Sequence, residues 1–112
     1  MQHLIETAVR TLVARIVQGR YPEAIEFCIA SRASASDLER VASEYPHTFI
    51  LPPPAAYKDL DILRVDDLER ELWSLRVPMW TREEGRSDLE LQLTVVIEDG
   101  RVGIELDDFL VP

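Results

Sequence analysis

Carboxylates are the residues whose spacing in this sequence could serve chemistry, and they gather in the segment WTREEGRSDLELQLTV, residues 80–95. A cluster of carboxylates can bind a hard cation such as Ca²⁺, and a pair can act as general acid and base in a cleft. The segment lacks the D-x-D-x-D-G spacing of a calcium loop. We therefore expect no metal site and no catalytic pair among its four acidic residues, which are Glu83, Glu84, Asp88 and Glu90.

Other catalytic patterns are missing from the sequence as well. The two histidines, His3 and His47, and the single cysteine, Cys28, form no H-x-x-x-H or C-x-x-C pair that could bind a metal. The four glycines form no phosphate-binding loop, and there is no G-x-S-x-G nucleophile motif. Cys28 lies in the apolar stretch EAIEFCIAS, which predicts a small core residue. The sequence indicates a protein that is not an enzyme and uses no cofactor.

Composition and charge limit the class of partner. The chain has 112 residues, 46% of them apolar, which fits a single folded domain spanning residues 1–112. Its 21 acidic residues outnumber the 12 basic ones, and the resulting net charge of −9 at pH 7 argues against binding to nucleic acid. The same charge would attract a basic protein, and it is also a common way for a protein to stay soluble.

Three features of the sequence indicate a location in the cytoplasm. Arg10 and Arg15 interrupt the first apolar helix, so no apolar run approaches the ~18 residues that a membrane span requires. No secretory signal is recognisable, and a single cysteine suits a reducing compartment. We expect a cytoplasmic protein, monomeric or weakly dimeric, that contacts no membrane.

Helical periodicity dominates the first half of the chain. Apolar residues at steps of three and four predict a helix over residues 3–18, and Gly19 stands where a C-terminal cap is needed. Pro22 is favoured in the first turn of a helix, and the apolar residues after it predict a second helix that ends around Ser31.

A third helix and a rigid connector follow. Ser36 and Glu39 have the S-x-x-E spacing of a capping box, which predicts a helix that begins at Ser36. Pro46 ends this helix, because the residue before a proline is pushed out of helical geometry. The three prolines at 52–54 predict an extended connector to the second half of the chain.

From residue 61 onward the period becomes two, which predicts an antiparallel sheet. Residues 61–65 read as a short strand, and Asp99-Gly100 has the composition of a type I′ hairpin turn. One extra residue near Asp107-Asp108 is needed to keep the apolar side chains on one face, which predicts a β-bulge. The expected cross-strand pairs are Ile97 with Val102, Val95 with Ile104, Leu93 with Leu106, Leu91 with Phe109, and Leu89 with Val111.

The acidic segment at residues 80–95 then contributes the turn and one strand of a second hairpin. Residues 71–80 pair with residues 89–97 around the loop TREEGRS, with Met79 opposite Leu89 and Val77 opposite Leu91. The leucines supply the core face on which the helices pack. The other face has polar residues and one large aromatic ring, namely Arg76, Trp80, Glu90, Gln92, Thr94, Glu105 and Asp107. An exposed aromatic in polar surroundings is typical of a partner-binding patch.

Three helices followed by a curved antiparallel sheet of three to four strands resemble the cystatin-like α+β folds. The string PMWTREEGRSDLELQLTV and the end ELDDFLVP also resemble a small bacterial domain family whose shared core reads LWT-x-EEGRSDL-x-L-x-LT, with Met79 here in place of Leu. This resemblance implies a bacterial origin and a compact domain. Small acidic domains of this kind are similar to the immunity proteins of toxin–immunity systems, including contact-dependent growth inhibition.

The leading hypothesis is therefore an immunity protein that binds a cognate basic toxin, such as a nuclease, and occludes its active cleft. We expect the partner-binding residues around the 81–90 loop and the adjacent sheet face: Trp80, Glu83, Glu84, Asp88, Glu90, Arg76, Glu105 and Asp107. An alternative surface is the acidic side of the third helix, with Asp37, Glu39 and Glu44. Two other classes stay open: a cystatin-like small-molecule-binding or enzymatic domain with a pocket between helices and sheet, and a structural or oligomerisation domain.

Overall fold

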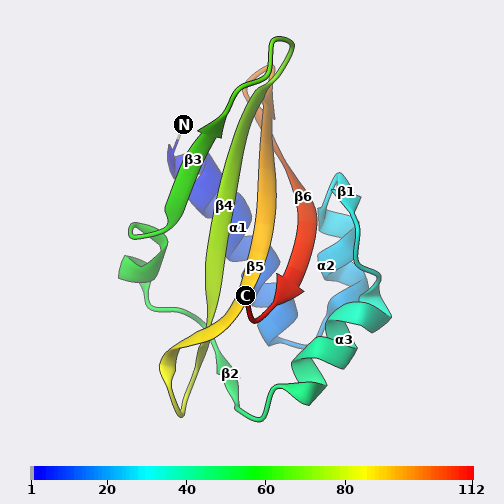
Figure 1. The fold of residues 1–112 in the computed structure, drawn as a ribbon, viewed down its shortest axis with the longest axis vertical. Coiled ribbons are helices and arrows are strands. Elements are labelled where there is room, and N and C mark those ends of the chain that lie inside the picture. The colour runs from blue at the N-terminus through cyan, green and yellow to red at the C-terminus, as the bar shows by residue number, and fades with distance from the viewer. Residues whose placement is uncertain (1) are drawn as a thin grey trace.

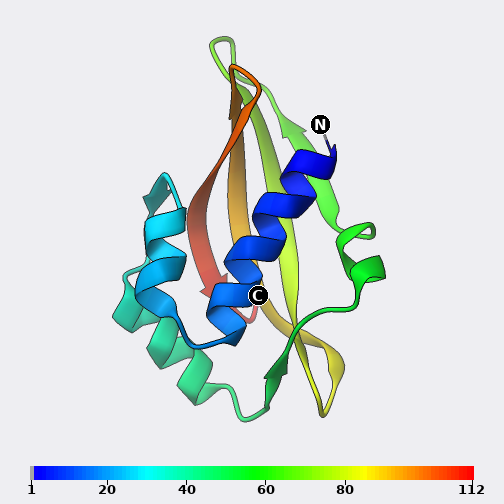
Figure 2. The same ribbon diagram turned by 180° about the vertical axis from the view of Figure 1, so that it is seen from behind.

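The fold combines α-helices with a six-stranded sheet (Figures 1 and 2). The computed structural model describes residues 2–112. The helices are α1 (Gln2–Val17), α2 (Tyr21–Phe27) and α3 (Ala35–Glu44), with a 3-10 helix, η1 (Pro54–Tyr57). The strands are β1 (Ala30–Ser31), β2 (Phe49–Ile50), β3 (Asp61–Val65), β4 (Glu71–Thr81), β5 (Gly85–Glu98) and β6 (Arg101–Leu110). Helix α1 crosses one face of the sheet, and α2 and α3 lie beside it at the β6 edge. The predicted α+β class is confirmed, but the sheet has more strands than the three to four expected.

The sheet is mixed rather than purely antiparallel. Its order is β1-β6-β5-β4-β2, and β3 also pairs with β4. The short strand β1 runs parallel to β6, whereas the other pairs are antiparallel. The strands that the sequence did not reveal, β1 and β2, have two residues each, which is too short for alternation to be recognised.

The core lies between the helices and the predicted apolar face of the sheet. In α1, Ile5, Val9, Leu12 and Ile16 are buried, as the helical spacing predicts. Gly19, just after α1, adopts a φ of +73°, the left-handed conformation that glycine tolerates at a helix C-terminus. No helix within residues 2–112 is long and apolar enough to cross a membrane.

The end of α2 differs from the prediction. The helix stops at Phe27 instead of continuing to Ser31, because the backbone that follows bonds to the edge of β6: Ile29 N donates to Ile104 O at 2.8 Å, and Arg32 N donates to Leu106 O at 2.9 Å. Gly103 permits this approach, since a Cβ there would lie 2.8 Å from Cδ1 of Ile29. Cys28 is half-buried at the helix end, and burial raises the pKa of its thiol to about 11.

The start of α3 is also displaced from the predicted position. Its capping box is formed by Ser34 and Asp37, not by Ser36 and Glu39. Asp37 N donates to Ser34 Oγ at 3.1 Å, and Ser34 N donates to Asp37 Oδ2 at 2.8 Å. An aspartate at the third helical position can satisfy the cap in the same way as a glutamate, so the motif applies two residues earlier. These hydrogen bonds lower the pKa of Asp37.

The β5–β6 hairpin is paired as predicted over most of its length. Asp99 and Gly100 have φ values of 52° and 73°, as a type I′ turn requires. The register shifts between Gln92 and Leu93, where Gln92 pairs with Asp108 and Leu93 with Leu106, so Asp107 is the extra residue of the predicted bulge. The prediction that Val111 faces Leu89 is wrong, because β6 ends at Leu110 and Val111 is 53% exposed.

The β4–β5 hairpin has a shorter turn than the expected loop TREEGRS. Val77 pairs with Leu91 as predicted, but Trp80 pairs with Arg86 and Thr81 with Gly85, so only residues 82–84 lie outside the strands. The single residue Met79 stands opposite residues 87–89, and the predicted pair of Met79 with Leu89 is not formed. The hydroxyl of Ser87 stabilises this irregularity by donating to the carbonyl of Met79 at 2.9 Å.

The proline-rich connector is only partly extended. Pro53 has extended geometry, whereas Pro54 begins η1. The last residue of η1, Tyr57, is buried, with 5% of its surface exposed. The guanidinium of Arg10 lies 4.5 Å from the centre of the Tyr57 ring and so ties the connector to α1. The connector therefore runs along the β4 edge of the sheet between β2 and β3 (Figure 1).

We expect Leu93→Ala to lower the free energy of unfolding by ~2–5 kcal/mol, because Leu93 is 1% exposed at the centre of β5 and its truncation leaves a cavity. Urea titration measures this loss. The matched control is Leu68→Ala, in the exposed turn between β3 and β4, which should change the same quantity by less than about 0.5 kcal/mol. Equal losses for the two variants would contradict the burial of Leu93.

Candidate functional site

The face of the sheet away from the helices has no second layer over it (Figure 1). We call this the open face. The cross-strand pairs Arg76 with Gln92 and Thr94 with Glu105 lie on it, because their strand neighbours Leu75, Val77, Leu93 and Val95 are buried on the helix side. Its residues between β4 and β6 include Ser74, Arg76, Pro78, Trp80, Glu90, Gln92, Thr94 and Glu105, together with the bulged Asp107 and the buried apolar pair Leu72 and Val96.

A charge-assisted pair forms the middle of the open face. Arg76 donates from Nε to Glu90 Oε2 at 2.7 Å and from Nη2 to Glu90 Oε1 at 3.2 Å, which is the two-point geometry of a strong ion pair. Gln92 Nε2 also donates to Glu90 Oε2 at 3.1 Å. Hydrogen bonds from the guanidinium to Glu90 raise the pKa of Arg76. Both oxygens of Glu90 are therefore occupied within the sheet.

The acidic residues of β6 differ from each other in their contacts. Asp107 accepts a hydrogen bond from Thr94 Oγ1 at 2.7 Å, which fixes the bulged residue against β5. The carboxylate of Glu105 is half-buried and has no hydrogen bond or ion pair among residues 2–112. Of these two predicted partner-binding residues, Glu105 keeps its charge available for a partner.

A pocket of about 350 Å³ opens beside the Arg76–Glu90 pair. On the outer edge of β4, β3 pairs as far as Arg76 and β2 pairs from Trp80 onward. The pocket lies between these two paired stretches. The connector covers the stretch of β4 between these two points. The pocket has apolar walls from Pro52, Ala56, Tyr57, Leu60, Val77, Pro78 and Trp80, and charged groups from Asp59, Asp61, Arg76, Arg86 and Glu90.

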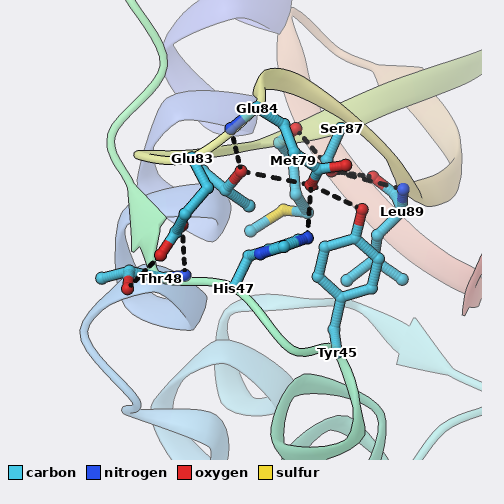
Figure 3. A network of polar contacts seen from close by, with 9 residues as sticks. Tyr45, His47, Thr48, Met79, Glu83, Glu84, Ser87 and Leu89 are labelled. Atoms are coloured by element: carbon cyan, nitrogen blue, oxygen red, sulfur yellow. Dashed lines mark hydrogen bonds and ion pairs between the residues drawn. The ribbon is translucent and has the colours of Figure 1, made fainter.

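The turn of the β4–β5 hairpin is fastened to the segment between α3 and β2 (Figure 3). Glu83 accepts two hydrogen bonds from Thr48, one from the backbone N at 2.8 Å and one from Oγ1 at 2.9 Å. Glu84 Oε1 accepts from Tyr45 Oη at 2.7 Å and from Thr81 Oγ1 at 3.2 Å. We call these five residues the hairpin clamp.

The hairpin clamp changes the interpretation of the predicted acidic loop. Both glutamates at the hairpin tip have partners inside the domain, and His47 Nε2 lies 3.8 Å from Glu84 Oε1. No local sequence pattern points to Tyr45 and Thr48, because each lies at least 35 residues from its glutamate. The structure therefore gives Glu83 and Glu84 a role in positioning the hairpin.

The side chains of the remaining predicted residues take no part in the clamp. Asp88 is exposed, and its side chain forms no hydrogen bond or ion pair within the described part of the chain. On the alternative surface along α3, Asp37 belongs to the capping box and Glu44 lies 3.7 Å from Arg40. Within residues 2–112, no three His, Cys, Asp or Glu side chains are arranged to hold a metal ion.

A family model matches residues 13–112 of the chain, and its description is Domain of unknown function (DUF7668). The chain belongs to this family. The matched range contains the open face, the pocket and the hairpin clamp of this DUF7668 domain. No curated protein and no solved structure matches the chain.

We expect Glu83→Gln to reduce stability in a pH-dependent way. The backbone N–H of Thr48 favours the charged carboxylate and lowers the pKa of Glu83 in the folded protein. Its contribution is therefore fully present above the unfolded-state pKa of about 4.3 and is lost as the pH falls through the lower folded pKa. Urea unfolding from about pH 7 to about pH 3 should show the difference between wild type and variant shrinking with acid.

Glu98→Gln is the matched control, because Glu98 is exposed at the end of β5 and its carboxylate accepts no hydrogen bond among residues 2–112. The control should lack the acid-dependent loss that Glu83→Gln shows. A difference between wild type and Glu83→Gln that stays constant over this pH range would contradict the charged hydrogen bond to Thr48.

Proposed function

We propose that this DUF7668 domain is a protein-binding module of the immunity type, which binds a basic toxin such as a nuclease and occludes its active cleft. The observation that supports the proposal best is an uncovered sheet face with a partly exposed Trp80, in a protein whose net charge is −9. A large aromatic side chain within a polar rim is the usual composition of an interface centre. The charge would attract a basic partner over longer distances.

The geometry of the open face suits a rigid partner. The Arg76–Glu90 pair and the Thr94–Asp107 bond hold their side chains in place before binding, so little side-chain entropy would be lost on association. Asp88 and Glu105 have no internal partner among residues 2–112 and are the carboxylates that would replace substrate phosphates in the toxin's cationic cleft. In this proposal the hairpin clamp positions the edge of the binding surface.

A second candidate function is small-molecule binding on the helix side. A cavity of about 310 Å³ lies between α1 and the sheet, lined by Gln2, Ile5, Leu60, Ile62 and Trp73. Its volume is within the range of small-ligand pockets, and its lining is mostly apolar. A ligand that binds here would change the environment of Trp73 and leave that of Trp80 unchanged, which distinguishes the two candidates.

The test is binding to the protein encoded next to the gene for this protein, which the proposal expects to carry the toxin domain, measured by surface plasmon resonance. We expect Trp80→Ala to speed dissociation, because a buried aromatic anchor determines how long the complex lasts. We expect Asp88→Lys with Glu105→Lys to slow association by about tenfold or more, and raised salt to slow association of the wild type.

The matched control is Asp66→Lys with Glu69→Lys. Both residues are exposed in the turn between β3 and β4, at the end of β4 far from Trp80. This control should retain most of the association rate. If Trp80→Ala and the Asp88/Glu105 double variant bind like the wild type, as the control does, the open face is not the interface. If the protein neither binds the neighbouring toxin nor protects cells that express it, the immunity proposal is wrong.

A further inference from the structure

Arginine side chains lie over three of the aromatic rings in this protein. The guanidinium carbon lies 4.5 Å from the ring centre for Arg10 over Tyr57, 5.1 Å for Arg15 over Phe27, and 5.2 Å for Arg64 over Trp73. Trp80, the other tryptophan, has no arginine over its ring among residues 2–112. An indole face is the best aromatic partner for a cation, so the ring of Trp80 could accept a cation from a ligand or partner.

The pocket beside Trp80 also contains carboxylates without partners. Asp59 and Asp61 are exposed, and their side chains form no hydrogen bond or ion pair within the described residues. The third carboxylate, Glu90, is neutralised by Arg76 at 2.7 Å. Three carboxylates and two guanidinium groups line the pocket, which gives it a net charge of −1.

The shape of the pocket limits what can enter. A volume of about 350 Å³ is at the lower end of the range for small-ligand sites, and it can hold one long side chain or a small molecule. Apolar atoms of Pro52, Pro78 and Leu60 form part of the wall, which suits the methylene stem of a long cationic side chain. A guanidinium is planar and weakly hydrated, so it stacks on an indole more readily than an ammonium does.

We propose that this pocket receives an arginine side chain of the partner protein, with the guanidinium stacked on Trp80 and its charge balanced by Asp59 and Asp61. The identity of the partner rests on the proposed function, whereas the chemistry of the pocket is tested without it. The arginine would be the anchor of a basic partner, in a recess at the edge of the open face that excludes water from its stem. Anchors of this type are enriched among residues that dominate binding energy.

An anionic ligand fits the pocket less well. Arg76 is already bonded to Glu90 through two nitrogen atoms, and the nearby charge of Asp61 interacts with Arg76 as well. Arg86 is then the one cation of the lining that could pair with an anion, and it would face the repulsion of Asp59 and Asp61. The charge balance therefore favours a cation.

The experiment is an NMR titration that follows the indole N–H signals of Trp73 and Trp80. The probe is N-acetyl-arginine amide, and N-acetyl-citrulline amide is the neutral control of almost the same shape. We expect the arginine probe to shift the Trp80 signal with a millimolar dissociation constant, and to leave Trp73 unchanged because Arg64 already covers that ring. The citrulline probe should shift neither signal.

Variants separate stacking from charge. Asp59→Asn with Asp61→Asn should weaken arginine binding about threefold or more, and Trp80→Leu, followed on backbone signals of β4, should weaken it about two- to fivefold. Asp66→Asn, at the exposed turn between β3 and β4, is the matched control and should bind like the wild type. Urea unfolding of each variant verifies that the fold is retained.

Three outcomes would overturn the proposal: equal shifts with arginine and citrulline, binding of N-acetyl-aspartate in preference to arginine, or no shift at Trp80 up to about 50 mM probe. The proposed function can fail separately. If the arginine probe binds but the neighbouring toxin does not, the pocket proposal stands and the immunity proposal falls. If the toxin binds and the Asp59/Asp61 and Trp80 variants retain full affinity for it, the immunity proposal stands and the pocket proposal falls.

Discussion

Side chains along β5 alternate between the helix side and the open face of the sheet, and this alternation is the constraint on which the rest of the structure depends. Leu89, Leu91, Leu93 and Val95 are each at most 1% exposed and all face the helices. A slip of one residue in either hairpin would turn these side chains onto the open face, so the burial of four apolar side chains holds the register. The turn at Asp99 and Gly100 sets that register, and the bulge at Asp107 maintains it to the end of β6.

The pocket is a consequence of how β4 meets its outer neighbours. Strand β4 has 11 residues, and β3 pairs with it only as far as Arg76. Strand β2 adds two further pairs, at Trp80 and Thr81. The proline-rich connector must cross the remaining gap, and its lack of backbone donors at three consecutive positions keeps it from extending the sheet there. The gap is therefore closed by η1, and this leaves a recess next to Trp80.

Periodicity predicted the parts of the fold that depend on neighbours in sequence. The long helix α1, the strand β3, the turn at Asp99 and the bulge at Asp107 all follow from local pattern, and the structure confirms them. Features that depend on distant partners were missed. Strand β1 exists because its backbone bonds to β6, some 75 residues later in the chain, and the partners of Glu83 and Glu84 lie between α3 and β2. The tight turn at residues 82–84 was missed because the irregularity opposite Met79 has no sequence signature.

Net charge gives an incomplete guide to the proposed binding surface, because many carboxylates of the domain already accept hydrogen bonds within it. Glu83, Glu84, Glu90 and Asp107 accept hydrogen bonds within the domain, so each would lose a partner if it moved toward another protein. Asp59, Asp61, Asp88 and Glu105 have no such bonds among residues 2–112 and can be approached without that loss. Unpaired carboxylates next to an available aromatic ring are therefore the better guide to the binding surface that we propose, and both features are present beside Trp80.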